Sequence, residues 1–343
     1  MPDLAAVVEQ ARAESAIAAL RDEGVYDDAR RVRGGEDGTV ELPVTAPPSE
    51  TAVLDVVRQV DPEPRGTDLE TLLADRGWDD GEIERAPGSW AVVGDVVLVR
   101  IPDDCPRPGE VGDALLDLQG AETVLARNGI EGPHREPDVE VLAGSGDTET
   151  VHVEHGTKYA LDMAEVMFSP GNKAERVRMG EVVEPGERVL DMFAGIGYFA
   201  LPMARAGAQV TAVERNPAAF RFLVENAVLN DVQDRLRPFR ADCRDVAEWH
   251  ADPEVDLDVT ADRVVMGYYE AHEYLDAALA VVESGGAIHV HEATPEAELP
   301  DRPVERLEGA AEEAGRAVDV EEVRRVKSYS EGVWHVVVDA AVG

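Results

Sequence analysis

The sequence predicts an α/β fold whose C-terminal half is a doubly wound, mostly parallel sheet, preceded by smaller α+β regions. Three observations predict it. After residue 180, short apolar segments alternate regularly with helical patterns, which is typical of strand–helix–strand units. The apolar run VLDMF ends in two closely spaced glycines and then continues as a helical pattern, as nucleotide-binding turns do. The last two strand-like segments are joined by a short turn, which indicates an antiparallel hairpin at the sheet edge.

The first region, residues 1–86, is predicted to be a small α+β module. Apolar residues at helical spacing over 4–21 predict an amphipathic helix, and the segment TVELPV at 39–44 follows a polar turn as a strand. Proline and glycine clusters then interrupt the chain repeatedly up to residue 86, and such clusters mark the joints of a module.

The second region, residues 87–165, reads as an α+β domain. The segment 90–101 alternates and then becomes continuously apolar, which predicts a strand pair or one bent strand. Helical spacing over 112–129 predicts a helix that Gly129 closes. Further strands are expected at 139–144, 149–156 and 158–163.

The third region, residues 166–343, carries the alternating pattern. Strands are predicted at 187–193, 209–214, 236–242, 261–267 and 287–292, helices at 197–207, 216–230, 271–286 and 304–315, and the closing hairpin strands at 319–329 and 332–342. In an open sheet of this kind the ligand binds beyond the carboxyl ends of the strands.

The chain is strongly acidic along its whole length. Its formal charge is −39, and lysine occurs only at Lys158, Lys173 and Lys327, while arginine is frequent. This composition is typical of salt-loving archaea. At molar salt the Debye length falls to about 3 Å, so acidity does not exclude a nucleic-acid partner.

Other classes of protein are disfavoured. Cys105 and Cys243 are too few and too far apart for a disulfide scaffold or a zinc site. No apolar run reaches the length of a membrane span, and the N-terminus lacks the regions of a signal peptide. We therefore expect a cytoplasmic protein with no membrane and no metal partner.

The glycine turn predicts a nucleoside-containing cofactor. Asp191 ends the first strand of the alternating region, and Gly195 and Gly197 follow in a segment where the backbone can approach a ligand closely. Glu214 ends the second strand, where a carboxylate can hold ribose hydroxyls, and Asp242 follows the third. The glycines alone leave NAD, FAD and S-adenosylmethionine open. Asp191 before them, and the Asn-Pro pair after Glu214, favour S-adenosylmethionine.

These segments carry a family resemblance. The stretches DMFAGIGYFALP, ERNPAAFRFLVENAVLN and ADCRD, with GDVVLVRIP, ETVHVEHG, KYALDM and MFSPGNKAERVRM upstream, resemble tRNA (guanine-37-N1)-methyltransferases and the wybutosine aminocarboxypropyltransferases. The resemblance covers roughly residues 87 to 343 and implies a class I methyltransferase-like Rossmann fold with seven strands. It does not reach the first module, which is a candidate tRNA-binding region.

The end of the fourth strand favours the wybutosine branch. The methyltransferases carry an Asn-Leu-Pro type motif there, whereas this chain has Met266, Gly267 and Tyr268. The segments GAIHVHEATPE and SYSEGVWHVVVDA also resemble the archaeal wybutosine transferases. The resemblance implies transfer of the 3-amino-3-carboxypropyl group of S-adenosylmethionine to C7 of 4-demethylwyosine at position 37 of tRNA(Phe), with release of 5′-methylthioadenosine. The alternatives are N1-methylation of guanine 37 and a non-catalytic tRNA-binding module.

The resemblance also implies candidate residues. Those expected at the cofactor are Ser169, Arg176, Asp191, Phe193, Gly195, Gly197, Glu214, Asn216, Asp242 and Cys243. Those expected at the tRNA anticodon region are Lys173, Arg178, Gly267 and Tyr268. No general base is assigned, and a monomer is favoured.

Four histidines invite a metal interpretation, which we disfavour. His152 and His155 fall on opposite faces of a strand, while His289 and His291 fall on one face. All four are interpreted as ordinary strand histidines. Tyr268 and Tyr269 can either stack on an extruded base or pack in the core.

Overall fold

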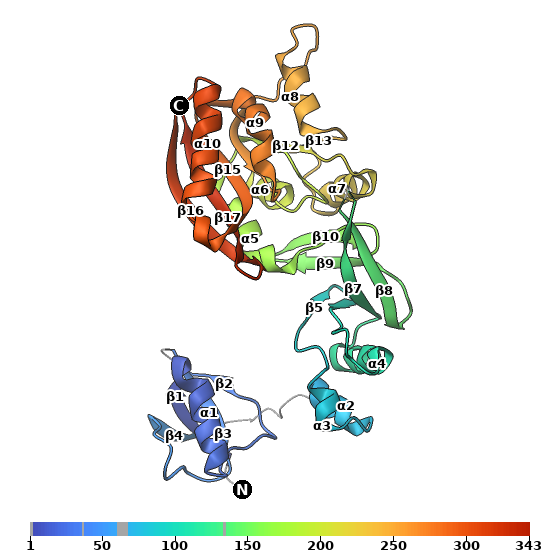
Figure 1. Cartoon of the computed structure of the whole chain (residues 1–343), viewed down its shortest axis with the longest axis vertical. Coiled ribbons are helices and arrows are strands. Elements are labelled where there is room, and N and C mark those ends of the chain that lie inside the picture. The colour runs from blue at the N-terminus through green and yellow to red at the C-terminus, as the bar shows by residue number, and fades with distance from the viewer. Residues whose placement is uncertain (1–2, 36–37, 60–67, 133–134) are drawn as a thin grey trace. The chain divides into compact units, whose positions relative to one another are not determined.

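The computed structural model describes residues 3–35, 38–59, 68–132 and 135–343 (Figure 1). The chain forms two compact units, residues 1–78 and 79–343. The domain boundaries predicted at residues 86 and 165 remain predictions, because compactness alone does not define a functional domain.

The first unit is a four-stranded antiparallel sheet with one long helix. Its sheet order is β2-β3-β1-β4, and α1 packs on it through Ala16 and Leu20. The elements are β1 (Leu4–Glu9), α1 (Ala13–Asp22), β2 (Arg33–Gly34), β3 (Thr39–Val44), β4 (Asp55–Arg58) and α2 (Leu69–Asp75).

The helix predicted over 4–21 is wrong in its first part, and the strand predicted at 39–44 is confirmed. Leu4–Glu9 forms β1, which pairs with both β3 and β4. A short apolar run fits a buried strand as well as a helix, so periodicity could not separate them. Pairing on both edges satisfies the backbone of β1 and decides the outcome.

The second unit begins with a short helix and a four-stranded sheet of order β5-β6-β7-β8. The predicted strand pair over 90–101 is confirmed as β5 and β6, which turn at Gly94. The elements up to the large sheet are α3 (Asp80–Ile83), β5 (Trp90–Val93), β6 (Val96–Val99), α4 (Pro108–Gln119), β7 (Thr123–Glu131), β8 (Glu136–Gly144), β9 (Glu149–Glu154), β10 (Thr157–Asp162) and α5 (Lys173–Val182).

The helix predicted over 112–129 is too long. It ends at Gly120, whose φ is +62° and whose N–H bonds to Leu116 O, and Gly129 lies inside β7. A left-handed glycine is a common helix terminus. The parallel pairing of Val96–Val99 with Thr123–Ala126 then holds the following residues as a strand.

The C-terminal part is the predicted doubly wound sheet, with seven strands in the order β13-β12-β11-β14-β15-β17-β16. The first five run parallel, and β17 and β16 form the predicted antiparallel edge hairpin. The elements are β11 (Arg188–Asp191), α6 (Ala200–Ala206), β12 (Gln209–Val213), α7 (Pro217–Leu229), β13 (Leu236–Phe239), α8 (Cys243–Ala251), β14 (Ala261–Met266), α9 (Leu275–Val281), β15 (Val282–Pro295), α10 (Asp301–Glu313), β16 (Val318–Ser330) and β17 (Val333–Val342).

Helices cover both faces of this sheet. One hydrophobic core joins the sheet to α5, α6 and α7, and a second joins it to α8, α9 and α10. The helix expected to run to residue 286 ends at Val281, because β15 begins at Val282 and pairs with β14 and β17. The helix α8 was not predicted. No helix in the described part of the chain is long and apolar enough to span a bilayer.

Candidate active site

A pocket opens at the carboxyl ends of the central strands of the seven-stranded sheet. Its lining includes Phe193 after β11, Glu214 after β12, Asp242 after β13 and Gly267 after β14. This is the edge where open α/β sheets bind ligands. The loop before α5 adds Ser169 to the lining.

The loop after β11 leaves bare backbone at the pocket. Gly195 lines the pocket with φ at +56°, and Gly197 has φ at +103°. A Cβ on Gly197 would lie 2.7 Å from Leu201 Cγ, so this position also needs glycine for packing. The loop is thus fixed in a shape that brings peptide groups up to a ligand.

Glu214 ties the loop to the second strand. Its carboxylate accepts hydrogen bonds from the N–H groups of Gly195 at 2.8 Å and Asn216 at 2.6 Å. Burial raises the pKa of Glu214. The backbone of Arg215 also contacts it. A carboxylate can accept about four hydrogen bonds, so Glu214 keeps acceptor capacity for a hydroxyl group of a ligand.

Asp242 and Asp191 have very different environments, although Asp191 ends one strand of the sheet and Asp242 follows another. Asp242 lines the pocket and begins α8, and hydrogen bonds from Arg244 lower its pKa. Asp191 is fully buried below the loop, where burial raises its pKa to about 7. Its Oδ1 accepts from Phe193 N at 3.3 Å, while Oδ2 has no partner among the described residues. Asp191 therefore supports the loop from beneath.

Aromatic rings form one wall of the pocket. The Phe193 ring lies 5.2 Å from Tyr268 and 5.0 Å from Tyr274, measured between centroids. Gly267 allows this wall to close, because a Cβ there would lie 2.7 Å from the Phe199 ring. Such a wall suits a flat heterocycle.

Arg176 reaches the pocket from α5 with most of its charge already paired. Its Nε and Nη2 contact the Glu154 carboxylate at 2.7 and 2.9 Å, and its Nη1 donates to Ser169 O at 3.0 Å. Burial alone would raise the pKa of Glu154, but hydrogen bonds from His152 and Arg176 hold it at about 2. A guanidinium has five N–H donors, so two remain for a ligand.

Comparison with known proteins places these features in a family. Residues 150–321 match the TRM5/TYW2 methyltransferase domain, and residues 69–148 match the TYW2 N-terminal domain. The tRNA(Phe) (4-demethylwyosine(37)-C(7)) aminocarboxypropyltransferase of Pyrococcus horikoshii is 42% identical over 263 residues, which are 76% of this chain and 91% of that protein. The chain belongs to the TRM5/TYW2 family.

Two solved structures of TYW2 and Trm5b proteins are similar to this chain. The crystal structure of P. horikoshii TYW2 in complex with MeSAdo has a TM-score of 0.68 and 39% identity, covering 79% of this chain and 96% of that one. Wild-type Trm5b from Pyrococcus abyssi has a TM-score of 0.72 and 29% identity, covering 99% of both chains. Residues 1–68 lie outside both family matches, but the Trm5b match extends over nearly the whole chain.

Most of the residues predicted from sequence meet at the pocket of this TRM5/TYW2 protein. Its lining includes Ser169, Arg176, Phe193, Gly195, Glu214, Asn216, Asp242, Cys243, Gly267 and Tyr268. Asp191, Gly197, Lys173 and Arg178 do not line it. Their contacts with cofactor or tRNA, like those of the lining residues, remain predictions.

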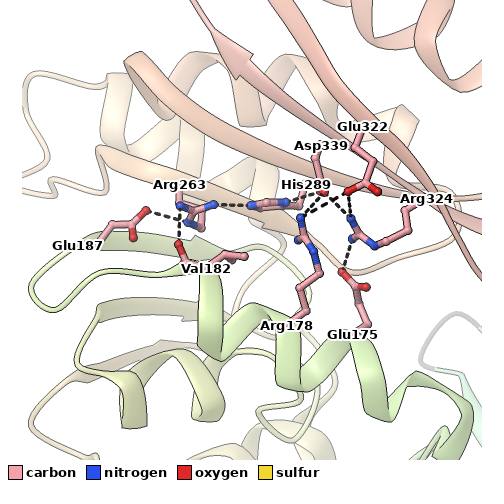
Figure 2. Close-up of polar contacts among 9 residues, drawn as sticks. All are labelled: Glu175, Arg178, Val182, Glu187, Arg263, His289, Glu322, Arg324 and Asp339. Atoms are coloured by element: carbon pink, nitrogen blue, oxygen red, sulfur yellow. Dashed lines mark hydrogen bonds and ion pairs between the residues drawn. The ribbon is translucent and has the colours of Figure 1, made fainter. Parts of the chain in front are cut away.

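Arg178 belongs to a buried polar network between α5 and the sheet (Figure 2). Its Nη2 donates to Asp339 Oδ2 at 2.7 Å, and Arg324 Nη1 contacts the same oxygen at 2.5 Å. Arg263 Nη1 donates to His289 Nε2 at 2.6 Å, so His289 Nδ1 carries the proton that reaches Asp339 Oδ1. A phosphate contact by Arg178 would have to compete with this ion pairing.

The network fixes the helix that follows Ser169. Arg324 Nη2 also donates to Glu175 on α5, and Arg263 Nη2 donates to Val182 O at the helix end (Figure 2). The side chains on the sheet come from β14, β15, β16 and β17. Four strands therefore hold one helix at the pocket.

Sequence reasoning missed several lining residues. Arg135 lines the pocket and lies 5.6 Å from the Tyr269 ring centroid. His291 and His335 line it from β15 and β17, and their ring nitrogens Nδ1 and Nε2 are 2.9 Å apart. Burial lowers the pKa of both rings, to about 3 for His335. No local motif marks these residues, since only the strand order brings them to the pocket.

Proposed function

We propose that the chain transfers the 3-amino-3-carboxypropyl group of S-adenosylmethionine to C7 of 4-demethylwyosine at position 37 of tRNA(Phe). The observation that carries this proposal is the 42% identity to the P. horikoshii aminocarboxypropyltransferase over 91% of its length. The fold alone does not choose the transferred group, because Trm5b shares it. The turn Met266-Gly267-Tyr268, which lacks the Asn-Leu-Pro type motif, supports the same choice.

The pocket fits an adenosyl sulfonium. Bare backbone at Gly195, a carboxylate with spare acceptor capacity at Glu214, and the Phe193 ring lie together in its lining. They match a close-packed nucleoside, ribose hydroxyls and a flat base respectively. Ser169, Arg176, Asn216, Asp242 and Cys243 complete the proposed cofactor site.

The reaction needs orientation more than acid–base strength. S-adenosylmethionine supplies an electrophilic carbon beside its sulfur, and transfer of that carbon to C7 releases 5′-methylthioadenosine and the C7 proton. The residues of this chain have to hold C7 in line with that carbon at near-attack distance. We propose that Gly267 and Tyr268 contact the tRNA base that accepts the group, and that the anticodon region of the tRNA enters beside them.

The proposal also covers the cellular compartment of the protein, its source and its oligomeric state. The three lysines and the charge of −39 support a halophilic archaeon as the source. A tRNA-modifying enzyme of this kind would act in the cytoplasm, and we favour a monomer. Residues 1–86 are proposed to contact tRNA.

The deciding experiment follows the label into tRNA. The protein is incubated at high potassium chloride with tRNA(Phe) that carries 4-demethylwyosine, using S-adenosylmethionine labelled separately in the methyl and carboxypropyl carbons. Carboxypropyl label in the tRNA is expected. Methyl label entering a parallel sample of tRNA(Phe) with unmodified guanine 37 would instead indicate guanine-37 methylation, and no label in either tRNA would indicate a binding module.

A second prediction concerns Glu214. Glu214→Ala is expected to weaken S-adenosylmethionine binding by about 1 to 3 kcal/mol, because its hydrogen bonding to ribose would be lost. Isothermal titration calorimetry measures the change, with Glu225→Ala on the exposed face of α7 as control. Unchanged affinity in Glu214→Ala would rule out its role at the ribose.

A further inference from the structure

The pocket extends along the sheet from Glu214 towards the antiparallel edge. Glu214 follows the second strand in the sheet order, while His335 lies on the sixth, β17, and both line the same pocket. The two sets of lining residues therefore address different parts of one ligand.

Lys327 lies beside this second part of the pocket. Its Nζ donates to Ser169 Oγ at 2.6 Å, and its register partner across the hairpin is His335. Ser169 and His335 both line the pocket. A Cβ on Gly171 would lie 3.0 Å from Lys327 Cδ, so the loop before α5 passes directly against the lysine stem.

The charge of Lys327 is not balanced by the protein. The structure gives it no ion pair with a carboxylate within residues 3–35, 38–59, 68–132 and 135–343, although the chain has 71 acidic residues. Partial burial, and then the charges of Arg176, Arg127 and Arg135, lower the pKa of Lys327 to about 8. A half-buried ammonium among like charges is unfavourable unless an anion joins it.

Asn172 supplies the complementary group. Asn172 lies in the same loop as Ser169, two residues before Ala174, and it lines the pocket. Its backbone N–H donates to Ser169 O at 3.2 Å. Its side-chain Oδ1 is buried and has no hydrogen-bond partner in the described part of the chain. A buried carbonyl oxygen without a donor is costly, and an ammonium group would satisfy it.

We infer that Lys327, Ser169 and Asn172 form a subsite for an α-amino acid group, which takes the amino-acid arm of S-adenosylmethionine. Lys327 Nζ donates to the α-carboxylate, and the Ser169 hydroxyl, which accepts from Lys327, has its own hydrogen free to donate to the same anion. Asn172 Oδ1 accepts from the α-ammonium. This assignment rests on the proposed function and adds Lys327 and Asn172 to it.

The subsite orients the group that is to be transferred. A group that is to be transferred has to be held at its far end so that its reactive carbon points to the acceptor. Arg176 has two N–H donors left after its contacts with Glu154 and Ser169 O. It can therefore add hydrogen bonds to the α-carboxylate, while Lys327 supplies the main positive charge. Lys327 and Asn172 are thus positioning residues for the transferred arm.

The test compares two ligands that differ only in the arm. Calorimetry at high potassium chloride measures the Kd of S-adenosylmethionine and of 5′-methylthioadenosine, which lacks the amino-acid arm, for the full chain and its variants. Lys327→Met is expected to weaken S-adenosylmethionine binding by about tenfold to a hundredfold, with 5′-methylthioadenosine binding within about twofold of the original. Lys327→Arg should retain more of the affinity than Lys327→Met. Lys158→Met, which removes an exposed lysine on β10, is the matched control.

Each outcome decides the inference. Unchanged S-adenosylmethionine affinity in Lys327→Met would overturn it, and so would an equal loss for both ligands, because the lysine would then only support the loop. Asn172→Leu should show the same selective loss, which guards against a folding defect peculiar to Lys327→Met. No tRNA is present, so this result is independent of which label enters tRNA in the test of the proposed function.

Discussion

Asp339→Ala is expected to lower the free energy of unfolding by about 3 to 5 kcal/mol. Asp339 is almost fully buried and accepts hydrogen bonds from His289, Arg178 and Arg324. Its removal leaves Arg178 and Arg324 sharing only the exposed carboxylate of Glu322. Thermal unfolding should show the midpoint falling by roughly 4 to 9 °C.

The pH dependence of this effect has a definite sign. Burial would raise the pKa of Asp339, but the hydrogen bond from His289 and the contacts of His289 and Arg324 hold it at about 2. A folded-state pKa below the ordinary value near 3.8 means that the ionised carboxylate stabilises the fold. The stability difference between the original protein and Asp339→Ala should be full above pH 4 and should shrink as pH falls towards 2.

The control for Asp339 lies on the neighbouring strand. Asp319→Ala removes an exposed carboxylate from β16, and exposed substitutions of this kind usually change stability by less than about 0.5 kcal/mol. A similar small change in both variants would show that the network in Figure 2 does not hold α5 on the sheet.

Arg176→Ala is expected to destabilise the protein by about 3 to 5 kcal/mol even without ligand, because Glu154 would be left buried and charged. The side chains of this pair are 3% and 5% exposed. Arg176 also lies 5.0 Å from the Phe168 ring centroid, a cation–π contact that adds to the loss. Denaturant unfolding of the ligand-free protein measures the effect.

A double variant separates the structural part of this role from any ligand contact. Arg176→Met with Glu154→Gln removes both charges and keeps most of the volume, so it should recover much of the lost stability. Any loss of S-adenosylmethionine affinity in this double variant would then report the two N–H donors of Arg176 that are not used in contacts with Glu154 and Ser169. Ligand-free stability in Arg176→Ala equal to that of the original protein would contradict the structural role.

Local sequence was sufficient for the acidic half of the site. Asp191 ends a short apolar strand, Glu214 and Asp242 each follow one, and all three precede a helix. Parallel strands bring their carboxyl ends to one edge. Order along the chain therefore predicted that Glu214 and Asp242 would meet at the pocket. It could not predict that Asp191 would lie beneath the loop, because side-chain direction depends on how the loop turns.

Prediction from local sequence failed where one apolar pattern was compatible with both a helix and a strand. The run at 4–9 and the stretch after Gly120 both had apolar spacing that a helix could use, and both became strands. The partners that decided this, β3 and β4 for the first and β6 for the second, come from elsewhere in the chain. Strand pairing is a tertiary interaction, so a window of neighbouring residues does not contain it.

By itself the sequence determined the alternating α/β fold, the glycine turn and the acids at the strand ends, because each depends on residues close together in the chain. The tertiary structure alone decided the partners of the basic residues Lys327 and Arg178. Lys327 meets Ser169 across 158 positions, and Arg178 meets Asp339 across 161. The interaction energy of a charged side chain depends on the groups around it. The order of strands β15, β17 and β16 brings those groups together.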